Sequence, residues 1–360
     1  MKEKIHNSEI ISIIYFVMRS TYIGIGINSY LYYTENDSYI SILIGILLGL
    51  VPLILMLKVS DIKKDKNINE KFNLFFGKKI GNIINIIISI FILFFTSFLF
   101  YDLTNFITSE YLYKTPSLFI EIMMLIPITY ILSKGLKAIC RTSIILFIIS
   151  ITFYIISILG LIPSFNVSNL LPFMKTDKCD LLLSSLSYIA YSILPLYILL
   201  IIPKDNFKNE QKSNKTIIIT SIITGIIILV SLMTTIGVLG IELASIYQYP
   251  DYQMLRRIQI GSFLQRTESI LAIQWFLSLF MMIVLCIYYI LKTKETIIPK
   301  FGNKTLIMIV NIILIIINEN LWPNNTTFIS FSIKNMPVIL YIFILLPILL
   351  LYIKSKKKCR

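Results

Sequence analysis

Long apolar segments recur along the whole chain, and each is about as long as a membrane is thick. Ten of them are separated by polar connections, at about 8–33, 38–58, 81–104, 117–134, 142–162, 181–202, 215–240, 268–291, 304–321 and 336–353. A helix needs about 20 predominantly apolar residues to cross a bilayer. The chain is also 56% hydrophobic, above the roughly 45–50% of soluble domains. The sequence therefore predicts an all-α polytopic membrane protein with ten transmembrane helices, in one domain over residues 1–360.

The basic residues are distributed unevenly between alternate connections. Most of the 33 lysines and arginines lie in the two tails and in the connections after the second, fourth, sixth and eighth segments. Cytoplasmic connections of membrane proteins carry an excess of Lys and Arg. Both termini are therefore predicted to be cytoplasmic. The net charge of +14 is interpreted as a topology signal, with the lipid bilayer and not nucleic acid as the partner.

The first apolar segment carries an unusual set of residues at membrane depth. It contains Arg19, Thr21 and the sequence Gly24-Ile25-Gly26. Glycine weakens a helix, and small residues also let two helices approach closely. The pattern is therefore either a close-packing notch or a place where the helix opens. Non-helical backbone at this depth is tolerated only where it is buried in protein or lines a cavity.

Ten segments divide into two sets of five, at about 8–162 and 181–353. An odd number of helices in each half reverses the orientation of the second half, which gives inverted repeats. Segment 6 then corresponds to segment 1, and it carries Tyr188, Tyr191 and Ser192 before Pro195. We therefore predict that helices 1 and 6 are both broken, as in transporters that hold solutes between opened helices.

Opened helices offer free main-chain groups to a ligand. At a break in segment 1, the N–H groups of Ile25, Gly26 and Ile27 would form a seat for a carboxylate. Hydroxyls and rings of Tyr188, Tyr191 and Ser192, with Tyr101 from segment 3, are predicted to close a pocket around it. Such a pocket suits a small neutral or zwitterionic solute, such as an amino acid.

The remaining polar groups of the segments invite structural interpretations. Arg19 lies in mid-segment, and either pairs with an acidic residue or contacts the ligand. The acidic groups lie within about two turns of an interface, where a side chain reaches water cheaply; they are Asp102, Glu121, Glu268 and Glu319. An interfacial tyrosine belt is predicted at the outer rim, from Tyr30, Tyr32, Tyr33, Tyr111, Tyr113, Tyr247, Tyr249 and Tyr252. The connection at 241–266 is either a lid or an inert loop.

Enzymatic chemistry finds no support in the sequence. The single histidine, His6, lies in the N-terminal tail, and the four cysteines are scattered without metal or redox spacing. There is no phosphate-binding loop and no nucleophile motif. No cofactor, metal site or enzymatic activity is therefore predicted.

Several short stretches resemble one known family. Gly24-Ile25-Gly26 resembles the Gly-x-Gly opening of the amino acid–polyamine–organocation (APC) superfamily, whose architecture is LeuT-like. The stretch from Ile260 to Glu268, with Tyr249-Pro250 before it, is similar to the B subunit of spore germination receptors. This likeness implies a nutrient germinant sensor of the spore inner membrane. It also implies a receptor A subunit and a lipoprotein C subunit as partners, and a germinant, commonly an amino acid, bound between segments 1, 3, 6 and 8.

Two departures from the superfamily bear on that implication. No proline follows the Gly-x-Gly, and Ala190-Tyr191-Ser192 stands where segment 6 commonly holds a glycine and an acidic residue. Arg266 and Glu268 are interpreted as a structural pair that holds the outer loop to segment 8. Two other functions stay open, namely an ion-coupled amino-acid secondary transporter of the APC superfamily and a structural or channel-forming subunit.

Overall fold

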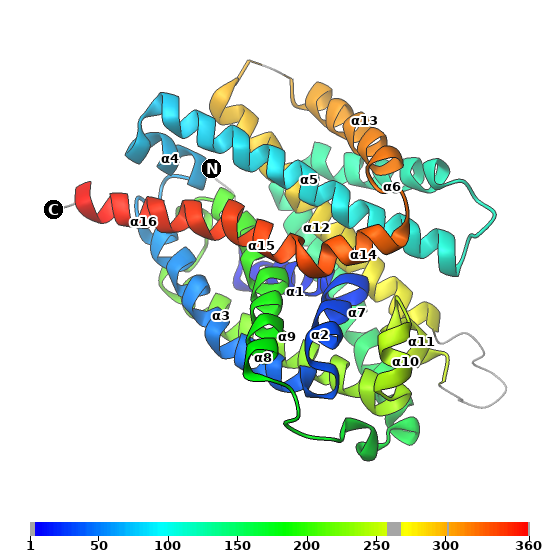
Figure 1. Cartoon of the computed structure of the whole chain (residues 1–360). Helices are drawn as coiled ribbons and strands as arrows, with labels where there is room; N and C mark the ends of the chain where they lie inside the picture. The colour runs from blue at the N-terminus through cyan, green and yellow to red at the C-terminus, as the bar shows by residue number, and fades with distance from the viewer. Residues whose placement is uncertain (1–3, 258–267, 301, 359–360) are drawn as a thin grey trace.

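The computed structural model describes residues 4–257, 268–300 and 302–358, without the side chains of residues 268–271. Within these ranges, nine helical runs are long and apolar enough to cross a membrane. They are Asn7–Asp61, Lys78–Glu110, Ser117–Lys134, Leu136–Ser164, Lys178–Ile201, Glu210–Leu239, Ala272–Ile297, Asn303–Leu321 and Met336–Lys358. The prediction of an all-α membrane protein is thereby confirmed (Figure 1).

The first run accounts for two of the ten predicted crossings. It has 55 residues, which at 1.5 Å per residue is about 80 Å of helix, far more than a bilayer core of about 30 Å. It consists of α1 (Asn7–Ser20), a π-helical turn (Tyr22–Gly26), α2 (Ile27–Thr34) and α3 (Ser38–Asp61). The chain turns between α2 and α3 at Glu35, which has a positive φ of 42°. Nine runs therefore agree with ten crossings.

The other elements follow along the chain. The α-helices are α4 (Ile68–Phe76), α5 (Lys78–Glu110), α6 (Ser117–Lys134), α7 (Leu136–Leu161), α8 (Lys178–Tyr188), α9 (Glu210–Leu239), α10 (Ile241–Ile246), α11 (Pro250–Leu255), α12 (Glu268–Ile297), α13 (Asn303–Leu321), α14 (Asn325–Lys334), α15 (Met336–Leu340) and α16 (Leu346–Lys358). After α8 the sixth crossing continues as a π-helical turn (Ile189–Ile193) and a 3-10 helix (Leu194–Ile201).

The two described ends of the chain contact the same side of the molecule. The N–H of Ile5 donates to the carbonyl of Asn206 at 2.7 Å, after the sixth crossing. The Lys358 ammonium donates to the carbonyl of Leu74 in α4 at 3.1 Å, after the second crossing. The tails thus share one face with connections that follow even-numbered crossings, as an even number of crossings requires.

A single carboxylate joins the connections of the opposite face. Asp37, between α2 and α3, accepts hydrogen bonds from the N–H groups of Met174, Lys175 and Thr176 at 2.8, 2.8 and 2.9 Å. These three residues belong to the segment that leads into α8. The corner between the first two crossings is therefore fixed to the start of the sixth.

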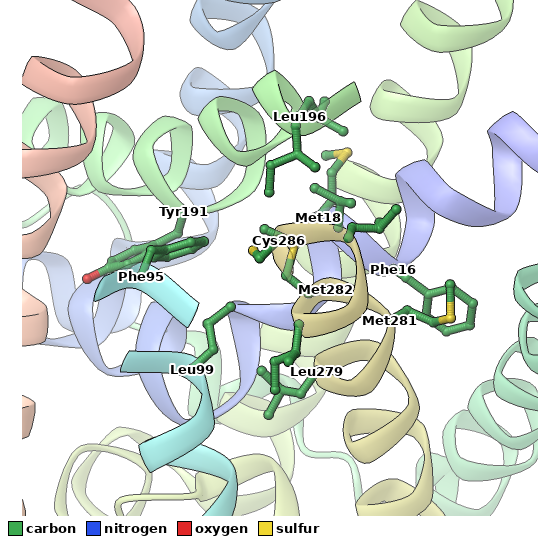
Figure 2. Packing of buried hydrophobic residues seen from close by; sticks show 14 of the residues in the cluster. Phe16, Met18, Phe95, Leu99, Tyr191, Leu196, Leu279, Met281, Met282 and Cys286 are labelled. Carbon is green, nitrogen blue, oxygen red and sulfur yellow. The ribbon is translucent and has the colours of Figure 1, made fainter. Parts of the chain in front are cut away.

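The middle of the bundle is formed by the sixth and eighth crossings. The most apolar stretches of Lys178–Ile201 and Ala272–Ile297 are 89% and 83% buried, against 17% for Leu136–Ser164 and 22% for Asn303–Leu321. Because their exposed surface is apolar, the latter two face lipid. Figure 2 shows how side chains of α1, α5, α12 and the sixth crossing meet in this core, namely Met18, Phe95, Leu99, Tyr191, Leu196, Leu279, Met282 and Cys286.

Candidate functional site

The first crossing is interrupted at the predicted glycines. Inside the π-helical turn, Ile23 is extended (φ −78°, ψ 134°) and Gly24 has a positive φ of 79°. The N–H of Gly26 donates to the carbonyl of Thr21 at 2.8 Å, and the N–H of Ile27 donates to that of Tyr22. Two of the three N–H groups predicted to receive a carboxylate are therefore engaged in this conformation, because the wide turn closes on its own carbonyls.

The backbone at the break is tightly covered by side chains. A Cβ at Gly24 would lie 2.8 Å from Cε1 of Tyr249 and 3.0 Å from each carboxylate oxygen of Asp102. A Cβ at Gly26 would lie 2.8 Å from the hydroxyl of Tyr30. Both positions therefore need glycine for close approach, and Gly24 needs it also for its torsion angle. π-helical turns of this kind are frequent at functional sites.

The sixth crossing meets this break directly. The hydroxyl of Thr21 donates to the carbonyl of Tyr191 at 2.7 Å, which lies in the π-helical turn Ile189–Ile193. The crossing changes there from an α-helix to a 3-10 helix, with Pro195 in the first turn of the 3-10 segment, where the missing N–H of proline is tolerated. The two irregular segments thus touch, although the sixth changes its winding without non-helical torsions like those of Ile23 and Gly24.

Asp102 of α5 is a buried carboxylate at the break. The side chain was expected to reach the membrane interface, yet it is fully buried because Tyr249 and the outer connection cover it. In the described part of the chain, neither carboxylate oxygen has a hydrogen-bond partner, and no lysine or arginine forms an ion pair with it. The neighbouring Tyr249 hydroxyl donates instead to the main-chain carbonyl of Asp102 at 3.4 Å.

Tyr249 is held in place by a network of amides. Its hydroxyl accepts hydrogen bonds from Asn105 at 2.9 Å and Gln248 at 2.8 Å. The side-chain oxygen of Asn325 in α14 accepts from the same two amides, at 3.2 and 3.0 Å. The Tyr249 ring packs against Phe106 and Trp275, with ring centroids 4.9 and 5.4 Å apart.

The outer connection also binds the broken backbone. The amide of Asn28 in α2 donates to the carbonyls of Gly24 and Gln248, each at 2.9 Å. Pro250 begins α11, where the missing N–H of proline is tolerated, and Tyr252 and Leu255 are buried on one face of that helix. The described part of the connection, residues 241–257, therefore lies over the break. The tyrosine belt holds only in part, because Tyr249, Tyr252 and Tyr30 are buried in the core.

Arg19 forms no salt bridge with an acidic residue of the described ranges. It donates to the Ser231 hydroxyl at 3.4 Å and lies over the rings of Tyr15, Tyr22 and Tyr154 at 5.7, 5.9 and 5.1 Å. The expected acidic pair is thus replaced by aromatic faces, which attract a cation.

The buried Asp251 of α11 is tied to the same part of the first crossing. It accepts hydrogen bonds from Tyr22 at 3.3 Å and from Thr235 of α9. Burial raises the pKa of Asp251 to about 6, while its hydrogen bonds and the Arg19 charge oppose that rise.

Two of the predicted pocket residues lie away from the break. Tyr101 is one position from Asp102, a rotation of about 100° on a helix, and its ring packs against Phe328 at 4.8 Å. Tyr188 fits between glycines of α3 and α9: a Cβ at Gly45 would be 2.7 Å from its ring, and one at Gly225 would be 2.6 Å from its hydroxyl.

The other predicted site residues have mixed positions. Ser192 is buried in the π-helical turn of the sixth crossing. The Tyr191 hydroxyl donates to the carbonyl of Ser332 in α14, so that hydroxyl is engaged in this conformation. The predicted pair of Arg266 with the Glu268 side chain lies outside the described residues.

The inner side of the break is closed as well. On the inner side, Met18 of α1 and Phe95 and Leu99 of α5 are buried in the apolar core (Figure 2). Further inward, the Tyr197 and Tyr289 hydroxyls are 3.0 Å apart, and Tyr289 donates to Asn69 of α4 at 3.1 Å. The break is therefore occluded from both faces in this conformation.

Three side chains of the site were missed or assigned other roles from sequence. Tyr249 and Asp251 flank Pro250, and that Tyr-Pro-Asp sequence in a polar loop was the available signal. Asp102 is acidic within the apolar run of α5, which by itself marks a functional position. In the described ranges, no three His, Cys, Asp or Glu residues gather to hold a metal.

The fold and site define a class of polytopic helical membrane proteins that are built around an irregular first crossing. Solved structures of two mutants of the manganese transporter of Eremococcus coleocola share the fold, with a TM-score of 0.56 and 13% identity, over 94% of this chain and 77% of theirs. This likeness shows an APC-like transporter fold and nothing about the solute.

The sequence itself assigns the family. The model of the spore germination protein family matches residues 4–329, and the chain belongs to that family. In Bacillus subtilis (strain 168), spore germination protein YndE is 25% identical over 89% of this chain and 88% of its own length. Spore germination protein KB is 18% identical over 90% and 88%, and spore germination protein A2 is 23% identical over 78% and 76%. Family and fold identify a non-enzymatic membrane protein.

Proposed function

We propose that this chain is the germinant-sensing membrane subunit of a spore germination receptor. It binds a small solute, an amino acid by preference, at the contact between the first and sixth crossings. Binding shifts an equilibrium between two conformations, which an A subunit and a lipoprotein C subunit read out. In this proposal the chain lies in the spore inner membrane with both termini in the cytoplasm, as the distribution of lysine and arginine favours.

One observation carries the proposal. The non-helical backbone at Ile23 and Gly24 is buried in mid-crossing, and it contacts the sixth crossing through Thr21, the third through Asp102 and the outer connection through Tyr249. Here the elements that must move for a solute to enter meet at one point, as a sensor requires.

The test uses spores in which this chain and its partner genes replace the resident receptors. Gly26→Val is expected to abolish the germination response to a nutrient panel, because a Cβ there would press on Tyr30 and Thr21. Gly302→Val is the control, because its Cβ would meet only Thr305, at 3.4 Å, in a connection away from the site. Immunoblots of the membrane fraction check that both variants accumulate. Wild-type sensitivity of Gly26→Val spores would contradict the proposal.

A second measurement separates sensing from transport. The purified chain is placed in proteoliposomes, and uptake of the radiolabelled germinant is followed with and without sodium or proton gradients. A sensor is expected to bind the solute without accumulating it. Robust concentrative uptake by this chain alone would identify a secondary transporter instead.

A further inference from the structure

Asp102 is a charge-bearing group without a counter-charge in the described part of the chain. Its two carboxylate oxygens are buried and make no hydrogen bond there. An isolated carboxylate in a low-dielectric interior is strongly disfavoured. Such a group either takes up a proton or pairs with a cation, and an ionisable residue at membrane depth beside irregular backbone is a candidate to pair with a cation that arrives from outside.

The position of this carboxylate relates it to the proposed solute. Both oxygens lie 3.0 Å from the place where a Gly24 side chain would begin, so they border the broken backbone directly. The sixth crossing offers Ala190, Tyr191 and Ser192, and none of these can neutralise a cation. Arg19, the buried cation of the first crossing, is engaged with tyrosine rings and Ser231.

We propose that Asp102 pairs with the primary ammonium group of the solute, which makes this a site for aminated solutes and not merely for small polar ones. The inference rests on the proposed function. Tyr249 occupies the approach, since its ring touches the same Gly24 position at 2.8 Å. An entering ammonium displaces Tyr249 from the break, and the amide network of Asn105, Gln248 and Asn325 is disturbed with it. The pairing thus connects solute chemistry to movement of the outer connection.

The experiment compares solutes that differ only at the nitrogen. The full chain is reconstituted in nanodiscs and carries Trp322→Phe, which removes one of its two tryptophans. The remaining tryptophan, Trp275, packs on Tyr249 and reports on its position. The twenty common amino acids are titrated while Trp275 fluorescence is recorded. The tightest binder is then compared with its 2-hydroxy acid, which carries a hydroxyl in place of the ammonium.

Asp102→Asn keeps the shape of the side chain and removes its charge. We expect Asp102→Asn to lower the affinity for the amino acid by roughly 10- to 100-fold, the usual range for a charge-assisted hydrogen bond. The affinity for the 2-hydroxy acid should be at least as high as in the parent chain. Retained hydroxy-acid binding shows that the variant is folded. Glu121→Gln is the matched control, because Glu121 is another membrane carboxylate but is bonded to Asn318 in α13, and it is expected to bind both solutes like the parent.

The outcomes are distinct. Unchanged amino-acid affinity in Asp102→Asn, or equal affinity of the parent for the amino acid and its hydroxy analogue, overturns the ammonium pairing and leaves the proposed function intact. If Asp102→Asn and Glu121→Gln both lower the affinity for the two solutes to the same extent, the effect is a general loss of fold, and the pairing is again overturned. Absence of binding by any amino acid to the parent chain refutes the proposed function, and the pairing with it.

Discussion

The contact between Gly24 and Tyr249 leads to a quantitative prediction. Gly24→Ala adds one methyl group where the backbone has a φ of 79° and the Tyr249 ring is 2.8 Å away. A residue other than glycine in a left-handed conformation costs about 1–2 kcal/mol. Overpacking by a methyl group in a filled interior costs about 1–3 kcal/mol more. We expect Gly24→Ala to destabilise the occluded conformation by about 2–5 kcal/mol.

A double-mutant cycle separates these two contributions. In a Tyr249→Ala background the ring contact is absent, so Gly24→Ala retains mainly the cost of its torsion angle. The two substitutions are therefore expected to couple by about 1–3 kcal/mol. Gly77→Ala is the control: Gly77 also has a positive φ, 85°, but nothing lies within 4 Å of its Cβ. Its cost is expected to be the same with Tyr249 or Ala at position 249.

Thermal unfolding provides the assay. In a background in which the exposed Cys179 and the tail residue Cys359 are replaced by serine, the remaining buried thiols of Cys140 and Cys286 react with a fluorogenic maleimide only when the core opens. Gly24→Ala is expected to lower the unfolding midpoint sharply in the parent and less in Tyr249→Ala, while Gly77→Ala lowers it equally in both. If the effects of Gly24→Ala and Tyr249→Ala simply add, the ring does not press on the break, and the account of Tyr249 as its cover is wrong.

Three further predictions follow from the same geometry. Thr21→Val leaves the Tyr191 carbonyl without its donor, so the unfolding free energy should fall by about 1–3 kcal/mol. The loss should be larger than for Thr104→Val, because the Thr104 hydroxyl bonds only within its own helix. Equal losses would contradict a stabilising hydrogen bond between the first and sixth crossings. Tyr191→Ala should shift the germinant dose–response without loss of protein, through the irregular turn that it anchors to Ser332; an unchanged curve would argue against that role. Burial raises the pKa of Asp251 from 3.8 to about 6, so Asp251 binds a proton more tightly when α11 is packed than when α11 is released. The free energy needed to release α11 should therefore fall by about 3 kcal/mol as the pH rises from 4 to 6, and should stay constant above pH 6. Hydrogen exchange of residues 250–255, corrected for intrinsic rates, measures this, and Asp251→Asn should remove the dependence.

The crossings and the first break could be predicted because their causes are local. Apolar runs of bilayer length, alternating basic connections and Gly24-Ile25-Gly26 are all properties of neighbouring residues. The resemblance to spore germination receptors was confirmed for the same reason, since its motifs are continuous stretches. The change of winding at Ile189–Ile193 lies just before Pro195, the local signal for it in the sequence, while the correspondence of the two halves stays a prediction.

The contents of the site depend on contacts between distant parts of the chain, which no local pattern specifies. Asp102 and Tyr249 are 147 positions apart, and the burial of both follows from how the outer connection settles over α5. Tyr101 was chosen in place of its neighbour because the rotation of α5 was unknown. The tyrosine rings around Arg19 come from α1, α7 and the first break, and no local pattern in the sequence places these three rings together.

The hydrogen bonds between Asp37 and residues 174–176 constrain how such a protein can move. With one side chain gripping three consecutive amides of a distant segment, the outer half of the first crossing cannot tilt without pulling on the lead-in to the sixth. A displacement that begins at Gly24 would therefore move the outer half of the first crossing and the start of the sixth crossing together. A neighbouring subunit that touched only the 174–176 stretch could then sense the event without ever contacting the solute.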